Sequence, residues 1–216
     1  MGVYGEKAQN LNGKCQDHIG MNYSKIANFF FELGMLKREK HNGFKLVGVH
    51  HDLGSLADHT MRASLIGAVL ASFEGVDVNK VAMMLLIHDV PEARIGDHHK
   101  LAARYMETKT VERDVFIEQI AHLPGSLKKE WLALYDEKHE RTTREGIVAQ
   151  DADWLEGVIS AREFQAQGYT ELEEWLNNTK AALETESAKQ LFREIEKQQP
   201  HDWWKGLKQM TYKKLL

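Results

Sequence analysis

The sequence predicts an all-α fold, organised as a single-domain helical bundle. Apolar residues recur at intervals of three and four over most of the chain, which is the helical period, and no segment shows the two-residue alternation of a half-buried strand. The 216 residues include only three prolines, and turn dipeptides are few. These observations favour a bundle of roughly eight helices packed around one core.

Each predicted helix has a recognisable apolar face or terminus. The first begins near Ser24, and the second follows Ser55. Asn79 suits the N-cap of the third, which Pro91 limits. Gly168 closes the sixth and Pro200 follows the last. The expected helices span residues 24–38, 56–73, 78–90, 101–121, 124–140, 142–168, 171–185 and 186–198.

The helices divide the chain into a central domain with two tails. Residues 1–20 are polar and lack periodicity, so we expect a loose N-terminal extension. Residues 21–198 hold all the helical segments and form the domain. Residues 199–216 are aromatic and basic, and we expect this tail to pack on the domain or on a second subunit.

Composition excludes several classes of protein. A net charge of −4 argues against a polyanion binder, so we expect no nucleic-acid partner. No apolar run is long enough to span a bilayer and no signal peptide is evident, so we expect no membrane contact. Cys15 is the single cysteine, which fits a reducing compartment. We therefore expect a cytoplasmic protein.

Four ionisable side chains, His59, His88, Asp89 and Asp151, fall on or beside helix faces that should be buried. His59 begins an apolar stripe, His88 continues one, and Asp151 lies between two apolar residues that are each four positions away. A lone histidine on such a face is more often a hydrogen-bonded core residue. Buried carboxylates are costly, however, and a cation would neutralise all four groups together. The conjunction therefore predicts a metal site.

Two other His-Asp pairs fit a site less well. His51-Asp52 lies in an irregular connector with no apolar stripe leading into it, although it could line a pocket. His201-Asp202 follows Pro200 beside two tryptophans, and we interpret it as a helix cap. Neither pair is predicted to bind the metal.

The motifs "ADHTMRA", "LLIHDVPEARIGD" and "VAQDADWLE" together resemble the HD-domain metal-dependent phosphohydrolases. "LKREKHNGF" before the first motif resembles the branch that contains the bacterial 5′-deoxynucleotidases. The resemblance extends from about Phe29 to Phe192. The HD pair alone is a weak signal, but His, His-Asp, Glu, Gly-Asp and Asp in this order are a specific one. The resemblance implies an HD-type helical fold.

The resemblance also implies roles for individual residues. The metal ligands would be His59, His88, Asp89 and Asp151, and Glu92 would be the catalytic carboxylate. Asp97 would act beside the substrate sugar, and Phe44 would contact the substrate. Gly43 stands where the bacterial enzymes carry an arginine, so Arg62 is a candidate to supply a cation to the substrate instead. His98 is a further candidate contact, although an exposed loop histidine is the commoner case.

These residues imply a metal-dependent phosphomonoester hydrolase. We expect one divalent transition metal per chain, chosen from Mn²⁺, Co²⁺, Fe²⁺, Zn²⁺ and Ni²⁺, with Mg²⁺ less suited to two imidazoles. The substrate would be a (deoxy)nucleoside 5′-monophosphate, and the family implies a homodimer. The alternatives are an HD-type hydrolase of a cyclic nucleotide, (p)ppGpp or a dNTP, and a non-catalytic metal-containing binding protein.

Overall fold

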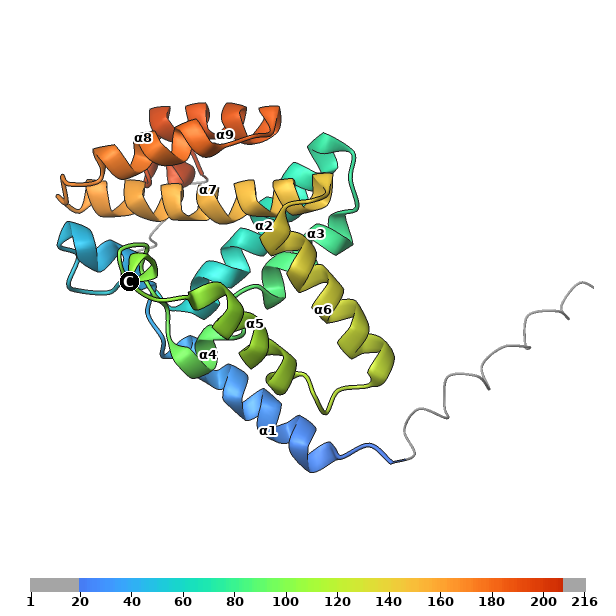
Figure 1. The fold of residues 1–216 in the computed structure, drawn as a ribbon. Helices are drawn as coiled ribbons and strands as arrows, with labels where there is room; N and C mark the ends of the chain where they lie inside the picture. The colour runs from blue at the N-terminus through green and yellow to red at the C-terminus, as the bar shows by residue number, and fades with distance from the viewer. Residues whose placement is uncertain (1–19, 208–216) are drawn as a thin grey trace, which may run out of the picture.

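The computed structural model describes residues 20–207, which form nine α-helices joined by loops and short 3-10 turns (Figure 1). Within this range the only strand-like pairing is one isolated bridge between Lys40 and Ser55. The all-α prediction is confirmed. The helices are α1 (Tyr23–Leu33), α2 (Leu56–Glu74), α3 (Val78–Ile87), α4 (Glu92–Ile95), α5 (Thr108–Gln119), α6 (Gly125–Glu140), α7 (Arg144–Ala166), α8 (Glu173–Ala182) and α9 (Glu186–Lys197).

Helix α7 is the centre of the fold. Helices α8 and α9 lie along one side of it, and α2, α3 and α6 pack on the other (Figure 1). Small residues allow the closest approaches. A side chain at Gly67 of α2 would meet Leu85 of α3, and one at Gly157 of α7 would meet the indole of Trp175. The core follows these contacts and is built mainly from α2, α3 and α7.

Side-chain caps fix where the site-bearing helices begin. The Ser55 hydroxyl accepts a bond from the Asp58 amide, and the Asp58 carboxylate accepts one from the Ser55 amide, so a capping box starts α2. Asp77 caps α3, two residues before the predicted Asn79. Thr143 caps α7 through the Gly146 amide.

Most of the predicted helices are shorter in the structure, and in two of them part of the expected helix forms a 3-10 turn instead. The helix expected over 24–38 ends at Leu33 and continues as a 3-10 turn over Gly34–Lys37. The helix expected over 101–121 forms only from Thr108, because the Glu107 side chain caps α5 there through the Thr110 amide. The preceding residues instead fold into a short turn over Ala102–Arg104.

The expected tails are only partly described. The N-terminal extension lies outside the described residues, apart from Gly20. Of the C-terminal tail, Trp203 lines a hollow with Ile159 and Ile195, while residues 208–216 lie outside the description. None of the helices in the described part of the chain has the length and apolar character that a membrane crossing needs.

Candidate metal centre and substrate pocket

His59 enters the site from the second turn of α2 with its two ring nitrogens in different surroundings. Nδ1 lies 2.5 Å from Oε2 of Glu156, which is the proton acceptor of this pair. Nε2 faces the other way and lies 3.3 Å from Oδ1 of Asp153 and 3.5 Å from Oδ2 of Asp89. A carboxylate on Nδ1 fixes the tautomer that leaves Nε2 free to bind a metal.

His88 and Asp89 arrive together at the C-terminal end of α3. The Nδ1 of His88 donates to the carbonyl of Leu85 at 2.6 Å, so its Nε2 is also free. That Nε2 lies 3.1 Å from Oδ2 of Asp89 and 3.7 Å from Oδ1 of Asp153. Both rings are buried. The predicted convergence of His59, His88 and Asp89 is therefore present.

The fourth predicted ligand is corrected by the structure. Asp151 is buried, but its carboxylate accepts bonds from the Glu184 amide and from the amide and hydroxyl of Thr185, where α9 begins. Asp153 stands beside the two histidines instead. Residues two apart on a helix point about 200° apart, so the two aspartates cannot share a face. The apolar stripe identified a buried aspartate but not the one at the site.

The four groups fit a cation. Because both histidines donate through Nδ1, their Nε2 lone pairs face each other at 3.4 Å and also face two carboxylate oxygens. Four electron-rich atoms in a buried space repel one another unless a positive charge lies between them. The pKa of His59 also shows that a positive charge is favoured at this position. Burial lowers it, but the Asp153 and Glu156 carboxylates raise it well above its usual range.

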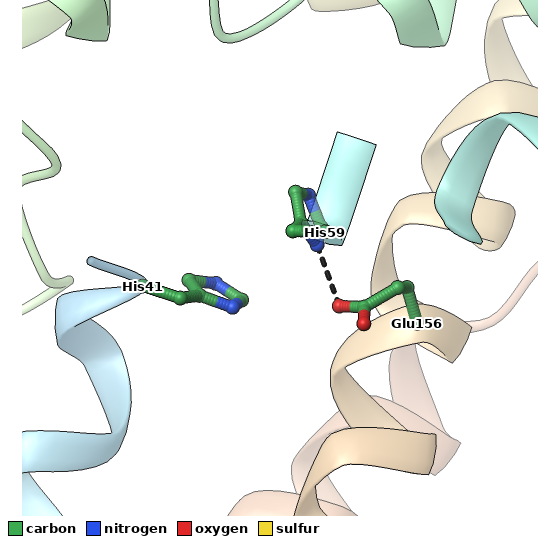
Figure 2. Close-up of side chains that lie close together, drawn as sticks. All are labelled: His41, His59 and Glu156. Atoms are coloured by element: carbon green, nitrogen blue, oxygen red, sulfur yellow. Dashed lines mark hydrogen bonds and ion pairs between the residues drawn. The ribbon is translucent and has the colours of Figure 1, made fainter. Parts of the chain in front are cut away.

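His41, His59 and Glu156 form a second group with metal-binding atoms close together (Figure 2). Figure 2 shows Glu156 on the Nδ1 side of His59, with the His41 ring across from it. The Glu156 carboxylate already accepts hydrogen bonds from His59 and Arg62. Burial raises the pKa of Glu156, but these two partners outweigh it and lower the pKa to about 2. We therefore interpret this group as the support of His59 rather than as a metal site.

Arg62 belongs to that support. It lines a hollow with His59 and Glu156 and not the pocket that contains Phe44, Glu92 and Asp97, which corrects its predicted role. Its guanidinium donates to Oε1 of Glu156 at 2.6 Å and to Oε1 of Glu163 at 2.7 Å. It also donates to the hydroxyl of Ser160. The arginine thus holds the glutamate that orients His59.

Arg62→Met should weaken Co²⁺ binding by roughly ten- to hundredfold without removing it, because Glu156 would lose the partner that fixes its position. Titration of the metal-free protein with Co²⁺ measures this. Arg113→Met removes an exposed arginine pair with Asp136 and is the control. Equal Co²⁺ affinity in both variants would contradict the role assigned to Arg62.

We call Nε2 of His59, Nε2 of His88, Oδ2 of Asp89 and Oδ1 of Asp153 the four-atom cluster. A pocket of about 500 Å³ opens beside it, and Asp153 belongs to the cluster and also lines the pocket. Phe44 forms part of its wall and packs on Trp175 and Phe164. The side chains that line it come from the loops after α1 and α4, the start of α4, and α7 and α8. They include His41, Phe44, Glu92, Asp97, His98, His99, Lys100, Asp153, Trp154, Trp175 and Asn178.

The predicted catalytic carboxylates both line this pocket. Glu92 begins α4 just after Pro91, and its Oε2 is buried without a hydrogen-bond partner among the described residues. Burial, together with the charges of Asp89 and Asp97, raises the pKa of Glu92 to about 11. Asp97 accepts a 2.5 Å bond from the Asn42 amide, so its carboxylate is tied to the segment that carries Phe44.

His98 also lines the pocket, and its Nδ1 is buried with no partner among the described residues. Neither of the other two His-Asp pairs lines this pocket, although Asp52 lines a separate hollow with His59. Asp52 pairs with Lys40, and Asp202 accepts the Gln199 amide and pairs with Lys205. His98 thus stays a candidate contact.

Sequence reasoning missed three residues of the site: Asp153, Glu156 and Lys138. Glu156 lies three positions after Asp153 and therefore on the same face of α7, which is a signal the sequence contained. Lys138 of α6 is buried and donates to Oδ2 of Asp153 at 2.9 Å. Lys138 is four positions after Leu134 and three after Tyr135, so it continues the buried face of α6, and this spacing is a signal that the sequence contained.

Comparison with known proteins gives matches over most of the chain. A family model described as HD domain matches residues 33–196. A Dictyostelium discoideum protein named 5′-deoxynucleotidase HDDC2 is 30% identical over 154 residues, which cover 67% of this chain and 80% of that protein. A conserved hypothetical protein from Pyrococcus furiosus is 28% identical with a TM-score of 0.66, covering 80% of this chain and 99% of that structure.

A third match supports the fold alone. The structure titled predicted metal-dependent phosphohydrolase, from Magnetospirillum magnetotacticum, is 21% identical with a TM-score of 0.63. It covers 81% of this chain and 91% of that structure.

Proposed function

Because the chain belongs to the HD-domain family, we propose that it is a metal-dependent phosphomonoester hydrolase that converts (deoxy)nucleoside 5′-monophosphates to nucleoside and phosphate. The observation that carries the proposal is the position of Asp153, which lies both in the four-atom cluster and in the wall of the pocket. A phosphate in this pocket would lie next to the cluster. The name of the Dictyostelium relative supports the nucleotide substrate.

The proposed metal ligands are Nε2 of His59 and His88 and single carboxylate oxygens of Asp89 and Asp153. Two nitrogen and two oxygen donors suit Mn²⁺, Co²⁺, Fe²⁺, Zn²⁺ or Ni²⁺ better than Mg²⁺, and we propose one such ion at this cluster. When bound, a divalent cation polarises a phosphoryl oxygen and increases the acidity of water.

The residues of the chain supply the remaining steps. Glu92 has a buried oxygen without a partner in the described part of the chain, so it can accept the proton of the attacking water. Positive charge at the neighbouring cluster offsets the repulsion from Asp89 and lowers the pKa of Glu92 toward the range of a general base. Asp97, anchored on the Asn42 amide, would position the sugar.

The walls of the pocket suit the nucleoside part of the substrate. Its volume of about 500 Å³ is that of a small-molecule site. Phe44, Trp154 and Trp175 offer aromatic surface for a base. His98, with its unpaired buried Nδ1, would donate to a substrate oxygen.

The function is tested by measuring phosphate release from a panel of nucleotides with Co²⁺ or Mn²⁺. We expect turnover of deoxynucleoside 5′-monophosphates and its loss after chelation with EDTA. Turnover confined to cyclic nucleotides, (p)ppGpp or dNTPs would replace the proposed substrate. No turnover of any phosphoester would support a non-catalytic binding protein.

We also propose that two copies associate through the outer face of α2. Met61, Leu65, Val69 and Phe73 recur at four-residue intervals on this face, and 62% of Leu65 and 73% of Phe73 are exposed. A helix that is apolar on all sides is normally buried on all sides. Two antiparallel copies of the stripe would place Leu65 beside Val69 of the other copy and Met61 beside Phe73.

Leu65→Glu should convert the dimer to a monomer, because a carboxylate would be buried at the centre of the paired stripes. Sedimentation or light scattering at several protein concentrations measures this. Phe31→Glu changes an equally apolar, 81% exposed position on α1 and is the control. A monomeric wild-type protein, or a dimer that survives Leu65→Glu, would contradict the interface.

A further inference from the structure

We propose that Lys138 is a positioning residue for the phosphoryl group, acting as a buried fixed positive charge behind Asp153. The inference rests on the proposed phosphohydrolase function and adds a residue on α6 to the site. Lys138 does not line the substrate pocket. Its influence on the phosphate would therefore pass through Asp153 and through the electrostatic field.

The contacts of Lys138 are specific. Its side chain is only 5% exposed, and its ammonium lies 2.9 Å from Oδ2 of Asp153. The amide of Gln150 donates to the same oxygen at 3.1 Å. With two donors on Oδ2, Asp153 presents Oδ1 alone to His59 and His88. The lysine thus holds this carboxylate in the orientation that the cluster requires.

Charge balance shows why the ammonium matters beyond this bond. The carboxylates of Asp89 and Asp153 would cancel a divalent cation, which leaves the cluster neutral. Glu156 is not one of the proposed ligands, and it pairs with Arg62, which it shares with Glu163. A phosphate dianion approaching a neutral cluster would meet the carboxyl groups of Glu92 and Asp97 in the pocket wall, and the cation of that wall, Lys100, is exposed to solvent, which screens its charge. Lys138 makes the cluster net positive and so favours the dianion.

The titratable groups next to Lys138 do not add a second positive charge at this position. Glu112 of α5 faces the same region, and its pKa is raised mainly by burial and by the charge of Asp89. His139 is the next residue, and burial together with the Lys138 charge lowers its pKa to about 4, so it adds no cation. The ammonium of Lys138 therefore contacts the proposed ligand Asp153 directly, at the carboxylate oxygen that does not face the histidines.

A simpler role would be that Lys138 only orients Asp153, and the two roles predict different results. An ammonium near a cation site opposes metal binding by repulsion, whereas an orienting hydrogen bond assists it. Removing the charge while keeping a hydrogen-bond donor should therefore weaken phosphate binding without weakening metal binding. Loss of orientation would weaken both.

Lys138→Gln is the decisive variant, because an amide can still donate to Asp153 but carries no charge. Co²⁺ affinity is measured on the metal-free protein by its visible absorption, and inorganic phosphate is then titrated into the Co²⁺-loaded protein. We expect phosphate affinity to fall about tenfold and Co²⁺ affinity to stay equal or rise. Lys138→Arg should keep phosphate affinity within about threefold of wild type.

Lys129→Gln, on the exposed side of the same helix, is the matched control and should change neither affinity. Lys138→Asn, which also keeps an amide donor and removes the charge, replaces the glutamine variant if that protein does not fold. Unchanged phosphate affinity, or a loss of Co²⁺ affinity with an altered absorption spectrum, would overturn the proposal. Both titrations can be read even if no nucleotide is hydrolysed, so failure of the proposed function is distinguishable from failure of this inference.

Discussion

Asp153→Asn should lower Co²⁺ affinity at least about a hundredfold, whereas Asp151→Asn should leave it unchanged. Asp153 turns one oxygen toward the Nε2 atoms of both histidines. The carboxylate of Asp151 instead accepts a hydrogen bond from the Thr185 amide at the start of α9. Titration of the metal-free proteins with Co²⁺ measures the difference. Phosphate release should follow the metal and disappear only in the Asp153 variant.

The two substitutions should also separate in stability. Asp151→Asn should change the free energy of unfolding by at most about 1 kcal/mol. It weakens the bonds to the Thr185 amide and hydroxyl, but it also removes the burial of a charge, which raises the pKa of Asp151. In Asp153→Asn the new amide oxygen can still accept a hydrogen bond from Lys138, but the buried ammonium loses its counter-charge. Because Lys138 and the two histidines hold the pKa of Asp153 well below its usual range, the metal-free Asp153 variant should be the less stable of the two. Co²⁺ binding lost in Asp151→Asn and retained in Asp153→Asn would contradict the corrected ligand set.

Glu92→Gln should reduce kcat about a hundred- to ten-thousandfold while the metal remains bound. The amide has the shape of the carboxylate but cannot accept a proton from water. It also removes an acid whose ionisation is opposed by burial and by the charges of Asp89 and Asp97. We therefore expect the metal-free variant to be at least as stable as the wild type.

The measurements for Glu92→Gln are steady-state phosphate release, Co²⁺ titration and thermal unfolding. Glu171→Gln is a suitable control, because it removes an exposed carboxylate from the outer rim of the same pocket. Wild-type turnover in Glu92→Gln would show that another group accepts the proton. Loss of Co²⁺ binding would show that Glu92 belongs to the metal site rather than to the reaction.

Much of the fold followed from local signals in the sequence. Helix α2 has both an apolar period and a capping box, and α7 starts at a threonine that caps it. Such signals depend on residues a few positions apart, which a sequence displays directly. The helix predicted over 101–121 was too long because the apolar stripe extended past the cap at Glu107.

The same reasoning located most of the site. His59 and His88 each continue a buried stripe of a separate helix, and both turn Nε2 into one cluster with Asp89. Arg62 was predicted to supply a cation to the substrate because Gly43 stands where the related bacterial enzymes carry an arginine. In the structure it faces Glu156 and Glu163 across the helix interface, which are partners 94 and 101 residues away.

By itself, the sequence determined the helical class, the order of the helices and the inward positions of His59, His88 and Asp89. The packing of α7 decided between Asp151 and Asp153. That helix is enclosed by α2, α3 and α6 on one side and by α8 and α9 on the other, so both aspartates are inward. Periodicity reports that a residue is buried, but only the neighbouring helix determines whether its carboxylate caps α9 or faces two imidazoles beside Lys138.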